Sequence, residues 1–279
     1  MKNIIIIGGD KRQEELNRLL LVEGYRCIYI NSCEKSKTDL KISDNDAVIL
    51  PVPVTKDKET VFSSNGIFSY KLNDILSLLN KTNLVFGGGF PEEVKDYLAE
   101  KHISYFDYLE SEEFTLYNAY LTGLGAVRLL NGSSGGDVRG KKVLVTGFGR
   151  VAKFTAQSLI REGCDIYVSA RNNIQLTEAE CIGYKTFELG KISSFLYIFD
   201  YVFNTVPHNI FSFEDINHFR GKYFELASAP YGVNREYFAG RDTDYIDGGS
   251  LPGRFLYLSA AKRLAKLTLK HINSRNGGD

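Results

Sequence analysis

Short apolar runs alternate with longer amphipathic segments along most of this chain. The apolar runs have the length of buried strands, and the amphipathic segments repeat their apolar residues with the period of a helix. This alternation is typical of parallel βαβ units, because a parallel strand needs a crossover before its neighbour. We therefore predict an α/β fold with two doubly wound domains, linked by long helices around a cleft.

The first half of the chain predicts one of these domains. A strand at 3–7 runs into Gly8-Gly9, and Asp10 is suited to cap the helix that follows, which ends at Gly24. This first turn lacks a dinucleotide fingerprint. Further strands are expected at 26–30, 47–50, 83–85 and 104–106, with helices near 71–80 and 91–101.

A long helix without proline is expected over residues 111–130, and the glycine- and serine-rich stretch 131–136 is expected to be a loop. An amphipathic helix from Leu256 to about Ile272 closes the chain, and by analogy we expect it to cross back to the first domain. The predicted domains are 1–125 plus 255–279, of substrate or catalytic type, and 126–254. Strands of the second domain are expected near 143–147, 165–170, 184–187, 200–204, 223–227 and 243–247.

Composition removes several classes of function. The 34 basic and 34 acidic residues cancel, which disfavours nucleic acid as a partner. No apolar run approaches the roughly 20 residues that span a bilayer, and the start of the chain does not have the pattern of a signal peptide. We expect a cytoplasmic protein without a metal site, because its four cysteines lack metal-binding spacing. These are Cys27, Cys33, Cys164 and Cys181.

The strongest motif is Gly147-Phe148-Gly149-Arg150-Val151-Ala152, a GxGxxA pattern between a buried strand and an amphipathic helix. In this context the first glycine permits a tight turn, and the second lets a pyrophosphate approach the backbone. The helix N-terminus then offers N–H groups and a partial positive charge. The alternative, an ordinary glycine turn, does not explain the agreement with the flanking elements. We predict that the second domain is a Rossmann domain that binds NAD(P).

The end of the next strand, Ser169-Ala170-Arg171, favours NADP(H) over NAD(H). NAD enzymes usually have an acidic residue there, about 20 residues after the glycines. An arginine and a serine hydroxyl would instead bind a 2′-phosphate. Arg171 as a solvated surface charge is the alternative, but it leaves the missing carboxylate unexplained.

Small and polar residues also end the later strands of this domain. Ligands bind at the carboxyl ends of strands in such sheets, so these residues are candidates for the ribose and nicotinamide. The candidates are Asn204, Thr205 and Val206 after the fourth strand, and Ala227 and Ser228 after the fifth.

With these motifs assembled, the chain resembles the family of the dipicolinate synthase A subunit over nearly its whole length. The matching segments lie in both domains and in the helix between them. They are Ile7–Gln13, Ala47–Pro53, Glu112-Glu113, Asn118-Ala119, Gly147–Arg150, Ala170-Arg171, Asn204–Pro207, Leu226–Ser228 and Leu251–Gly253.

Two positions depart from the family pattern. Leu124 stands where the family has a glutamate, and Leu258 stands where it has a lysine. Both changes remove polar groups near the expected cleft, which leaves cofactor binding intact and puts the substrate in question. The chain thus resembles a divergent member.

The resemblance implies an NADP-dependent oxidoreductase subunit that dehydrogenates a cyclic dihydrodipicolinate-type dicarboxylate in dipicolinate biosynthesis during sporulation, together with a flavoprotein partner subunit. Two carboxylates call for cationic or N–H ligands. Arg254 and Arg12 are the candidates, although Arg12 fits a solvated helix charge equally well. Asn118, one helical turn from Thr122, and His208, which could also be a plain loop residue, complete the catalytic set.

Other interpretations stay open. The chain could be an NADP-dependent dehydrogenase of another small hydroxy or amino acid, or a cofactor-binding subunit without turnover. Homo-oligomerisation is compatible with the sequence. Tyr231 and Asp247 are lesser candidates, and the run Gly87–Gly89 is either a place of close ligand approach or a strand-to-helix loop.

Overall fold

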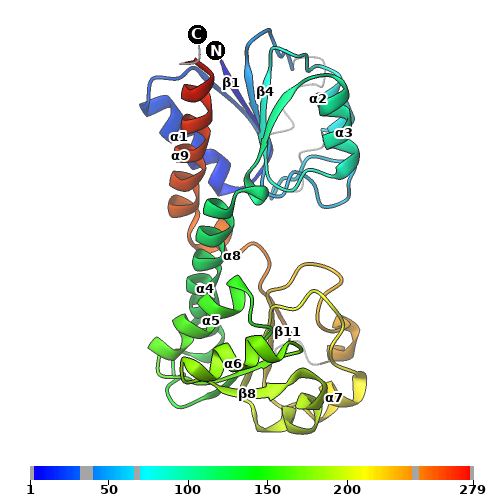
Figure 1. Ribbon diagram of the computed structural model, residues 1–279, viewed down its shortest axis with the longest axis vertical. Coiled ribbons are helices and arrows are strands. Elements are labelled where there is room, and N and C mark those ends of the chain that lie inside the picture. The colour runs from blue at the N-terminus through cyan, green and yellow to red at the C-terminus, as the bar shows by residue number, and fades with distance from the viewer. Residues whose placement is uncertain (1–2, 32–39, 66–69, 241–244, 277–279) are drawn as a thin grey trace. The chain divides into compact units, whose positions relative to one another are not determined.

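The computed structural model describes residues 3–31, 40–65, 70–240 and 245–276, which form two compact α/β units (Figure 1). The first unit comprises Met1–Asn118 and Leu256–Asp279, and the second comprises Ala119–Phe255. Cys33 and the first residues of the predicted strand 243–247 lie outside the described residues.

The first unit contains a five-stranded parallel sheet in the order β2-β1-β3-β4-β5. The order reverses between β1 and β3, so the carboxyl ends of these two strands are where such folds place ligands. The strands are β1 (Ile4–Ile7), β2 (Cys27–Ile30), β3 (Ala47–Ile49), β4 (Leu84–Gly87) and β5 (Ser104–Asp107).

Helices cover both faces of this sheet, which explains why β1 is four isoleucines. Ile5 and Ile7 pack into one core cluster, and Ile4 and Ile6 into the other. In Figure 1, α1 and α9 lie on one face and α2 and α3 on the other. The helices are α1 (Lys11–Val22), α2 (Leu72–Leu76), α3 (Glu92–Glu100) and α9 (Tyr257–Asn276), with the 3-10 turn η2 (Tyr108–Glu110).

The second unit contains a six-stranded parallel sheet in the order β11-β10-β9-β6-β7-β8, the strand order of a Rossmann domain. Its strands are β6 (Lys142–Thr146), β7 (Asp165–Ala170), β8 (Lys185–Glu188), β9 (Tyr201–Asn204), β10 (Lys222–Glu225) and β11 (Tyr245–Asp247). Its helices are α5 (Arg150–Arg161), α6 (Asn173–Cys181), α7 (Phe213–His218) and α8 (Leu251–Phe255), with η3 (Leu189–Ile198) and η4 (Arg235–Phe238).

One helix, α4 (Glu112–Ser134), runs from the first unit into the second. The predicted loop at 131–136 was wrong over residues 131–134, because the helix continues through Gly132 to Ser134. Leu129 and Leu130 are buried in the core of the second unit, and this packing outweighs the cost of about 1 kcal/mol for one helical glycine. Gly135 and Gly136, both with positive φ, end the helix instead.

The units divide after Asn118 and Phe255, whereas the sequence suggested divisions after residues 125 and 254. The first division falls inside α4, where the continuous helix leaves no turn that a sequence pattern could show.

Candidate functional site

The GxGxxA turn joins β6 to α5, as the sequence predicted, and its glycines differ in what they do. Gly147 has a φ of +82°, and a Cβ there would lie 2.8 Å from Thr205 Oγ1, so only glycine fits. Gly149 has an ordinary φ of −80°, yet a Cβ there would meet nothing within 4 Å. The second glycine is therefore not needed by the fold itself, and it leaves open space over the turn where a phosphate can approach the backbone.

The N-terminus of α5 faces this space without a capping side chain, because its N-cap residue is Gly149. The first N–H groups of a helix and its dipole together favour an anion at this position. Arg150 is exposed at the first helical position and Val151 is half-buried. Phe148 is 1% exposed and packs in the core, so it anchors the turn rather than presenting its ring to a ligand.

The two predicted phosphate-binding side chains at the end of β7, Arg171 and Ser169, differ in exposure. Arg171 is exposed, and its guanidinium forms no ion pair within the described part of the chain, so it is free to hold a 2′-phosphate. Ser169 is fully buried, and its Oγ has no hydrogen-bond partner among the described residues. Our expectation that the Ser169 hydroxyl faces a 2′-phosphate is not supported, because strand alternation turns it to the buried sheet face that carries Tyr167. Ala170 is also buried.

Asn204, at the end of β9, is fully buried and connects the strand ends. Its Oδ1 accepts hydrogen bonds from Thr146 Oγ1 at 2.6 Å and from the Val206 N–H at 3.0 Å. The Thr205 hydroxyl donates to the Thr146 carbonyl at 2.6 Å. Asn204 therefore acts by holding the following loop, and the half-buried Thr205 and Val206 are the residues of this group that reach the surface.

A buried carboxylate, which our sequence reasoning passed over, lies beneath these loops. Glu225 ends β10 and is 2% exposed. Its Oε1 accepts from Asn204 Nδ2 at 2.6 Å and from the Ala227 N–H at 3.0 Å, and its Oε2 accepts from the Gly232 N–H at 2.8 Å. The signal that could have found it was a charged residue that follows two aromatic residues at the end of a strand.

Burial raises the pKa of the Glu225 carboxyl above its ordinary range, and the hydrogen bonds that it accepts counter only part of this effect. The segment that these bonds hold includes the half-buried Ala227 and the exposed Ser228, both predicted cofactor residues, and the exposed Tyr231. The end of β6 and the loops after β9 and β10 thus share one polar network.

The predicted catalytic residues of the second unit are exposed. Arg254 Nη1 donates to the Asp247 carbonyl at 2.8 Å, and the guanidinium lies 5.3 Å from the Phe255 ring centre. His208 lies on the loop after β9 with its side chain at the surface. By contrast, Asn118, the last residue of the first unit on this stretch of chain, is half-buried on α4, and Thr122, one turn later, is buried.

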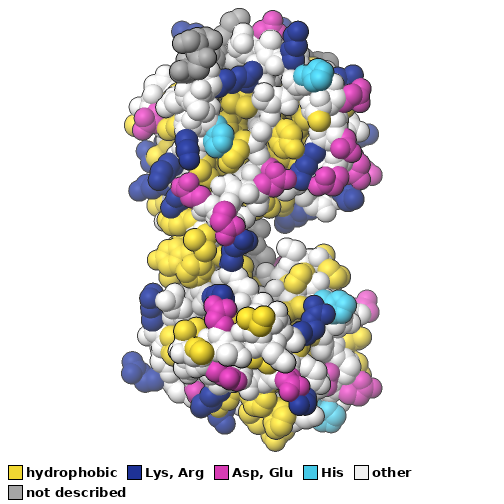
Figure 2. Space-filling view, viewed as in Figure 1, with side chains coloured by type: hydrophobic (Ala, Val, Ile, Leu, Met, Phe, Trp, Pro, Cys, Tyr) yellow, Lys and Arg dark blue, Asp and Glu magenta, His cyan; other side chains and the backbone are white. Residues whose placement is uncertain are grey.

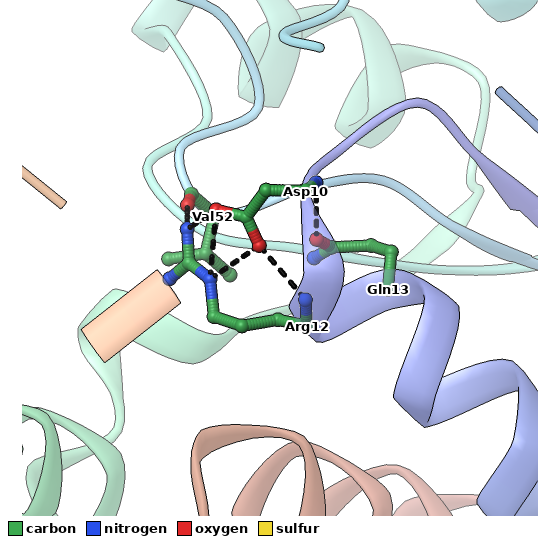
Figure 3. Close-up of polar contacts among 4 residues, drawn as sticks. All are labelled: Asp10, Arg12, Gln13 and Val52. Carbon is green, nitrogen blue, oxygen red and sulfur yellow. Dashed lines mark hydrogen bonds and ion pairs between the residues drawn. The ribbon is translucent and has the colours of Figure 1, made fainter. Parts of the chain in front are cut away.

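Arg12 was predicted to be either a ligand for a substrate carboxylate or a solvated helix charge, and its environment in the structure matches neither prediction. It is 4% exposed, and its Nε and Nη2 donate to the Asp10 carboxylate at 2.9 and 2.8 Å (Figure 3). Nη2 also donates to the Val52 carbonyl, on the loop that follows β3. The pair therefore bridges β1 and β3 at the point where the strand order of the first sheet reverses.

The same carboxylate closes the first turn of this sheet. Asp10 accepts from the Arg12 N–H at 2.9 Å, and the Asp10 N–H donates to Gln13 Oε1, which completes a capping box. Gly9 bonds to the backbone of residues 62 and 64. The N-terminus of α1 is thus capped by side chains of the protein itself, at a turn that lacks a dinucleotide fingerprint.

The Gly87–Gly89 run serves packing and not ligand approach. A Cβ on Gly87 would lie 2.7 Å from Val54, and one on Gly88 would lie 2.7 Å from Val52. The Gly89 N–H donates to the Asp107 carboxylate at 2.8 Å. The strand-to-helix loop is therefore the correct interpretation.

The two leucines that replace family polar residues differ in exposure. Leu124 is half-buried on α4, and Leu258 is 49% exposed near the start of α9. Neither supplies a group that could hold a carboxylate.

Three further features concern the described residues as a whole: potential metal ligands, helices that could span a membrane, and the distribution of charge. Within them, no group of three potential metal ligands gathers, and no helix is both long and apolar enough to cross a membrane. Basic and acidic side chains are interspersed over the face shown in Figure 2, in keeping with the zero net charge.

Comparison with known proteins supports the predicted resemblance. Residues 3–109 match the family model for the N-terminal domain of the dipicolinate synthase A subunit. The crystal structure of this subunit from Bacillus halodurans has a TM-score of 0.77 at 21% identity, covering 96% of this chain and 97% of that one. The corresponding dipicolinate synthase chain from Bacillus subtilis gives 0.78 at 21% identity, covering 99% and 97%. The chain is thus similar to the A subunit of dipicolinate synthase, as its motifs predicted.

The apo-structure of D-lactate dehydrogenase from Escherichia coli is similar more distantly, with a TM-score of 0.65 at 10% identity over 99% of this chain and 98% of that one. No curated protein matched the chain. At these identities the structural likeness shows the fold, and the predicted α/β fold with two parallel sheets is confirmed.

Proposed function

We propose that this chain, which resembles the dipicolinate synthase A subunit, is one component of an NADP-dependent oxidoreductase. The observation that carries the proposal is the turn between β6 and α5, where Gly149 leaves open space in front of an uncapped helix N-terminus. A pyrophosphate fits both features, because it needs close backbone approach and N–H donors.

Preference for NADP over NAD is supported by Arg171. Its exposed guanidinium follows β7, where an acidic residue would repel a 2′-phosphate. Asn172 caps α6 directly after it, which fixes the backbone on which Arg171 stands. A planar guanidinium can donate two parallel hydrogen bonds to a phosphate.

The substrate we propose is a cyclic dihydrodipicolinate-type dicarboxylate, oxidised to its aromatic pyridine in dipicolinate biosynthesis during sporulation. Bound NADP+ would supply the hydride acceptor, and the ring proton that leaves with the hydride would pass to solvent. This chain would bind and orient the dianion. Arg254 is the leading carboxylate ligand, because it is exposed and donates hydrogen bonds to neutral carbonyls. Asn118 and His208 are proposed to contribute further polar contacts.

The same proposal places the protein in the cytoplasm with a flavoprotein partner subunit. It is supported by the likeness to a protein whose name makes it one subunit of a larger enzyme.

A second candidate function is dehydrogenation of another small hydroxy or amino acid. It is favoured by the Arg12–Asp10 ion pair, because an arginine already neutralised by a carboxylate is a poor ligand for a dianion. Leu124 and Leu258 also favour this second candidate, because apolar side chains do not stabilise the charge of a dicarboxylate.

Two measurements test these proposals in order. Calorimetry with NADPH and NADH should show tighter binding of NADPH, and absence of binding to either would refute the cofactor assignment. Product absorbance should then show pyridine dicarboxylate formed from the dihydro precursor and NADP+, with the flavoprotein partner supplied. Tight NADPH binding without this product would reject the dipicolinate reaction and leave the second candidate.

A further inference from the structure

The polar network around Glu225 joins the carboxyl ends of three strands, β6, β9 and β10. Through Oε1 the carboxylate accepts from Asn204, which in turn accepts from the Thr146 hydroxyl one residue before the GxGxxA turn. The Asn204 amide also bonds to both the N–H and the carbonyl of Val206. One buried carboxylate is therefore connected to the end of β6 and to the loop after β9.

The same carboxylate fastens both ends of the loop after β10. The Ala227 N–H binds Oε1 at the start of this loop, and the Gly232 N–H binds Oε2 at its end. A Cβ on Gly232 would lie 2.3 Å from Asn204 Nδ2 and 2.4 Å from Tyr223 Oη, so the loop end is seated directly on the network. The geometry of residues 226–231 is thus set by a group beneath the surface.

The chemistry of the site requires an acceptor with two free oxygens. Asn204 Nδ2 and two backbone N–H groups point at the carboxylate, and the Tyr223 hydroxyl donates to Oε2 at 3.3 Å. An amide in place of the carboxylate would turn its own NH₂ toward at least one of these donors. The ionisable groups that face Glu225 are Tyr223 on its own strand and Tyr245 on β11.

We propose that Glu225 is a positioning residue for the nicotinamide half of the cofactor, an inference that rests on the proposed function. In a Rossmann sheet each half binds one mononucleotide. Gly147–Ala152 and Arg171 belong to the half formed by β6, β7 and β8, which takes the adenosine phosphates. Glu225 fastens the loops of β9 and β10 in the opposite half, so it acts on the nicotinamide side through Thr205, Val206 and residues 226–231.

The experiment compares two ligands on the full chain. NADPH occupies both halves, whereas 2′,5′-ADP occupies only the adenosine half. In Glu225→Gln we expect NADPH to bind about tenfold or more weakly, as expected for the loss of a charge-assisted hydrogen bond, and 2′,5′-ADP to bind within about twofold of the unmodified protein. NADPH fluorescence should report a changed nicotinamide environment. Glu214→Gln, at an exposed position on α7, is the matched control and should leave both affinities unchanged.

The outcomes separate this inference from the proposed function. If the unmodified protein binds neither ligand, the proposed function fails. If it binds both and Glu225→Gln binds NADPH as before, the positioning role is wrong. Should Glu225→Gln not fold, Glu225→Asp keeps a carboxylate that is too short to reach both loop ends. The same selective loss of NADPH then supports the role, and equal loss of both ligands overturns it.

Discussion

At the scale of single residues, we propose that cofactor preference depends on the guanidinium of Arg171. Arg171→Ala should lower NADPH affinity by roughly 1.5–3 kcal/mol, because it removes a charge-assisted hydrogen bond to the 2′-phosphate. NADH affinity should stay nearly constant. Calorimetry with both cofactors measures this, with Arg161→Ala, an exposed arginine at the end of α5, as the control. Equal loss of the two affinities would mean that Arg171 does not contact the 2′-phosphate.

The buried carboxyl of Glu225 should couple stability to pH. Its folded pKa is raised, chiefly by burial, so the folded state holds this proton more tightly than the unfolded chain does. The resulting stabilisation is complete below the unfolded pKa of about 4.3 and is lost as pH rises through the folded value. Relative to Glu225→Gln, the unmodified protein should therefore lose unfolding free energy as pH rises above about 4.3. Urea titrations of both proteins across this range test the sign, and a constant difference would contradict it.

Single-residue roles were predictable where they depend on the backbone and not where they depend on burial. Gly147 and Gly149 could be placed from spacing alone, because a turn between strand and helix fixes their surroundings. Ser169 and Arg12 were misjudged, since their sequence neighbours do not reveal which way a strand-end or helix-start side chain turns. Glu225 was missed for the same reason, because its partners come from separate loops.

At the scale of elements, two of the three glycines of α4 have opposite expected effects. A Cβ on Gly123 would lie 2.6 Å from the backbone of Phe154 in α5, whereas one on Gly132 would meet nothing within 4 Å. Gly123→Ala should destabilise the protein by about 1–3 kcal/mol through overpacking. Gly132→Ala in the same helix should stabilise it by about 0.5–1 kcal/mol through helix propensity. Chemical denaturation distinguishes the two, and stabilisation by Gly123→Ala would show that α4 and α5 can move apart without cost.

The elements themselves were predictable wherever both faces of a strand are buried. The four isoleucines of β1 and the apolar run of β6 are sequence patterns that predict such strands. The end of α4 was not predictable from the sequence. Composition alone places the helix end before the glycine- and serine-rich stretch, but core packing of Leu129 and Leu130 extends the helix into it.

At the scale of the whole molecule, the C-terminal helix ties the end of the chain to its beginning. Leu264, Leu267 and Ile272 of α9 are at most 2% exposed and share a core cluster with Ile4 and Ile6 of β1. The sequence could show that α9 has an apolar face, but its destination came only from analogy. Periodicity identifies a buried face without identifying the surface that buries it.

A chain that stops at Phe255 should therefore lose the first unit and keep the second. Truncating one buried leucine costs about 2–5 kcal/mol, and a whole domain has only about 5–15 kcal/mol of stability, so removing the entire apolar face of α9 should unfold the first sheet. The two core clusters of the second unit contain residues from Ala126 to Phe255 and none from α9, so the packing of these clusters does not depend on α9. Limited proteolysis of residues 1–255 should digest the first unit rapidly, while calorimetry should show NADPH affinity unchanged. Protection of the first unit would mean that α9 is dispensable for its core, and loss of NADPH binding would mean that the Rossmann unit does not fold independently of the first.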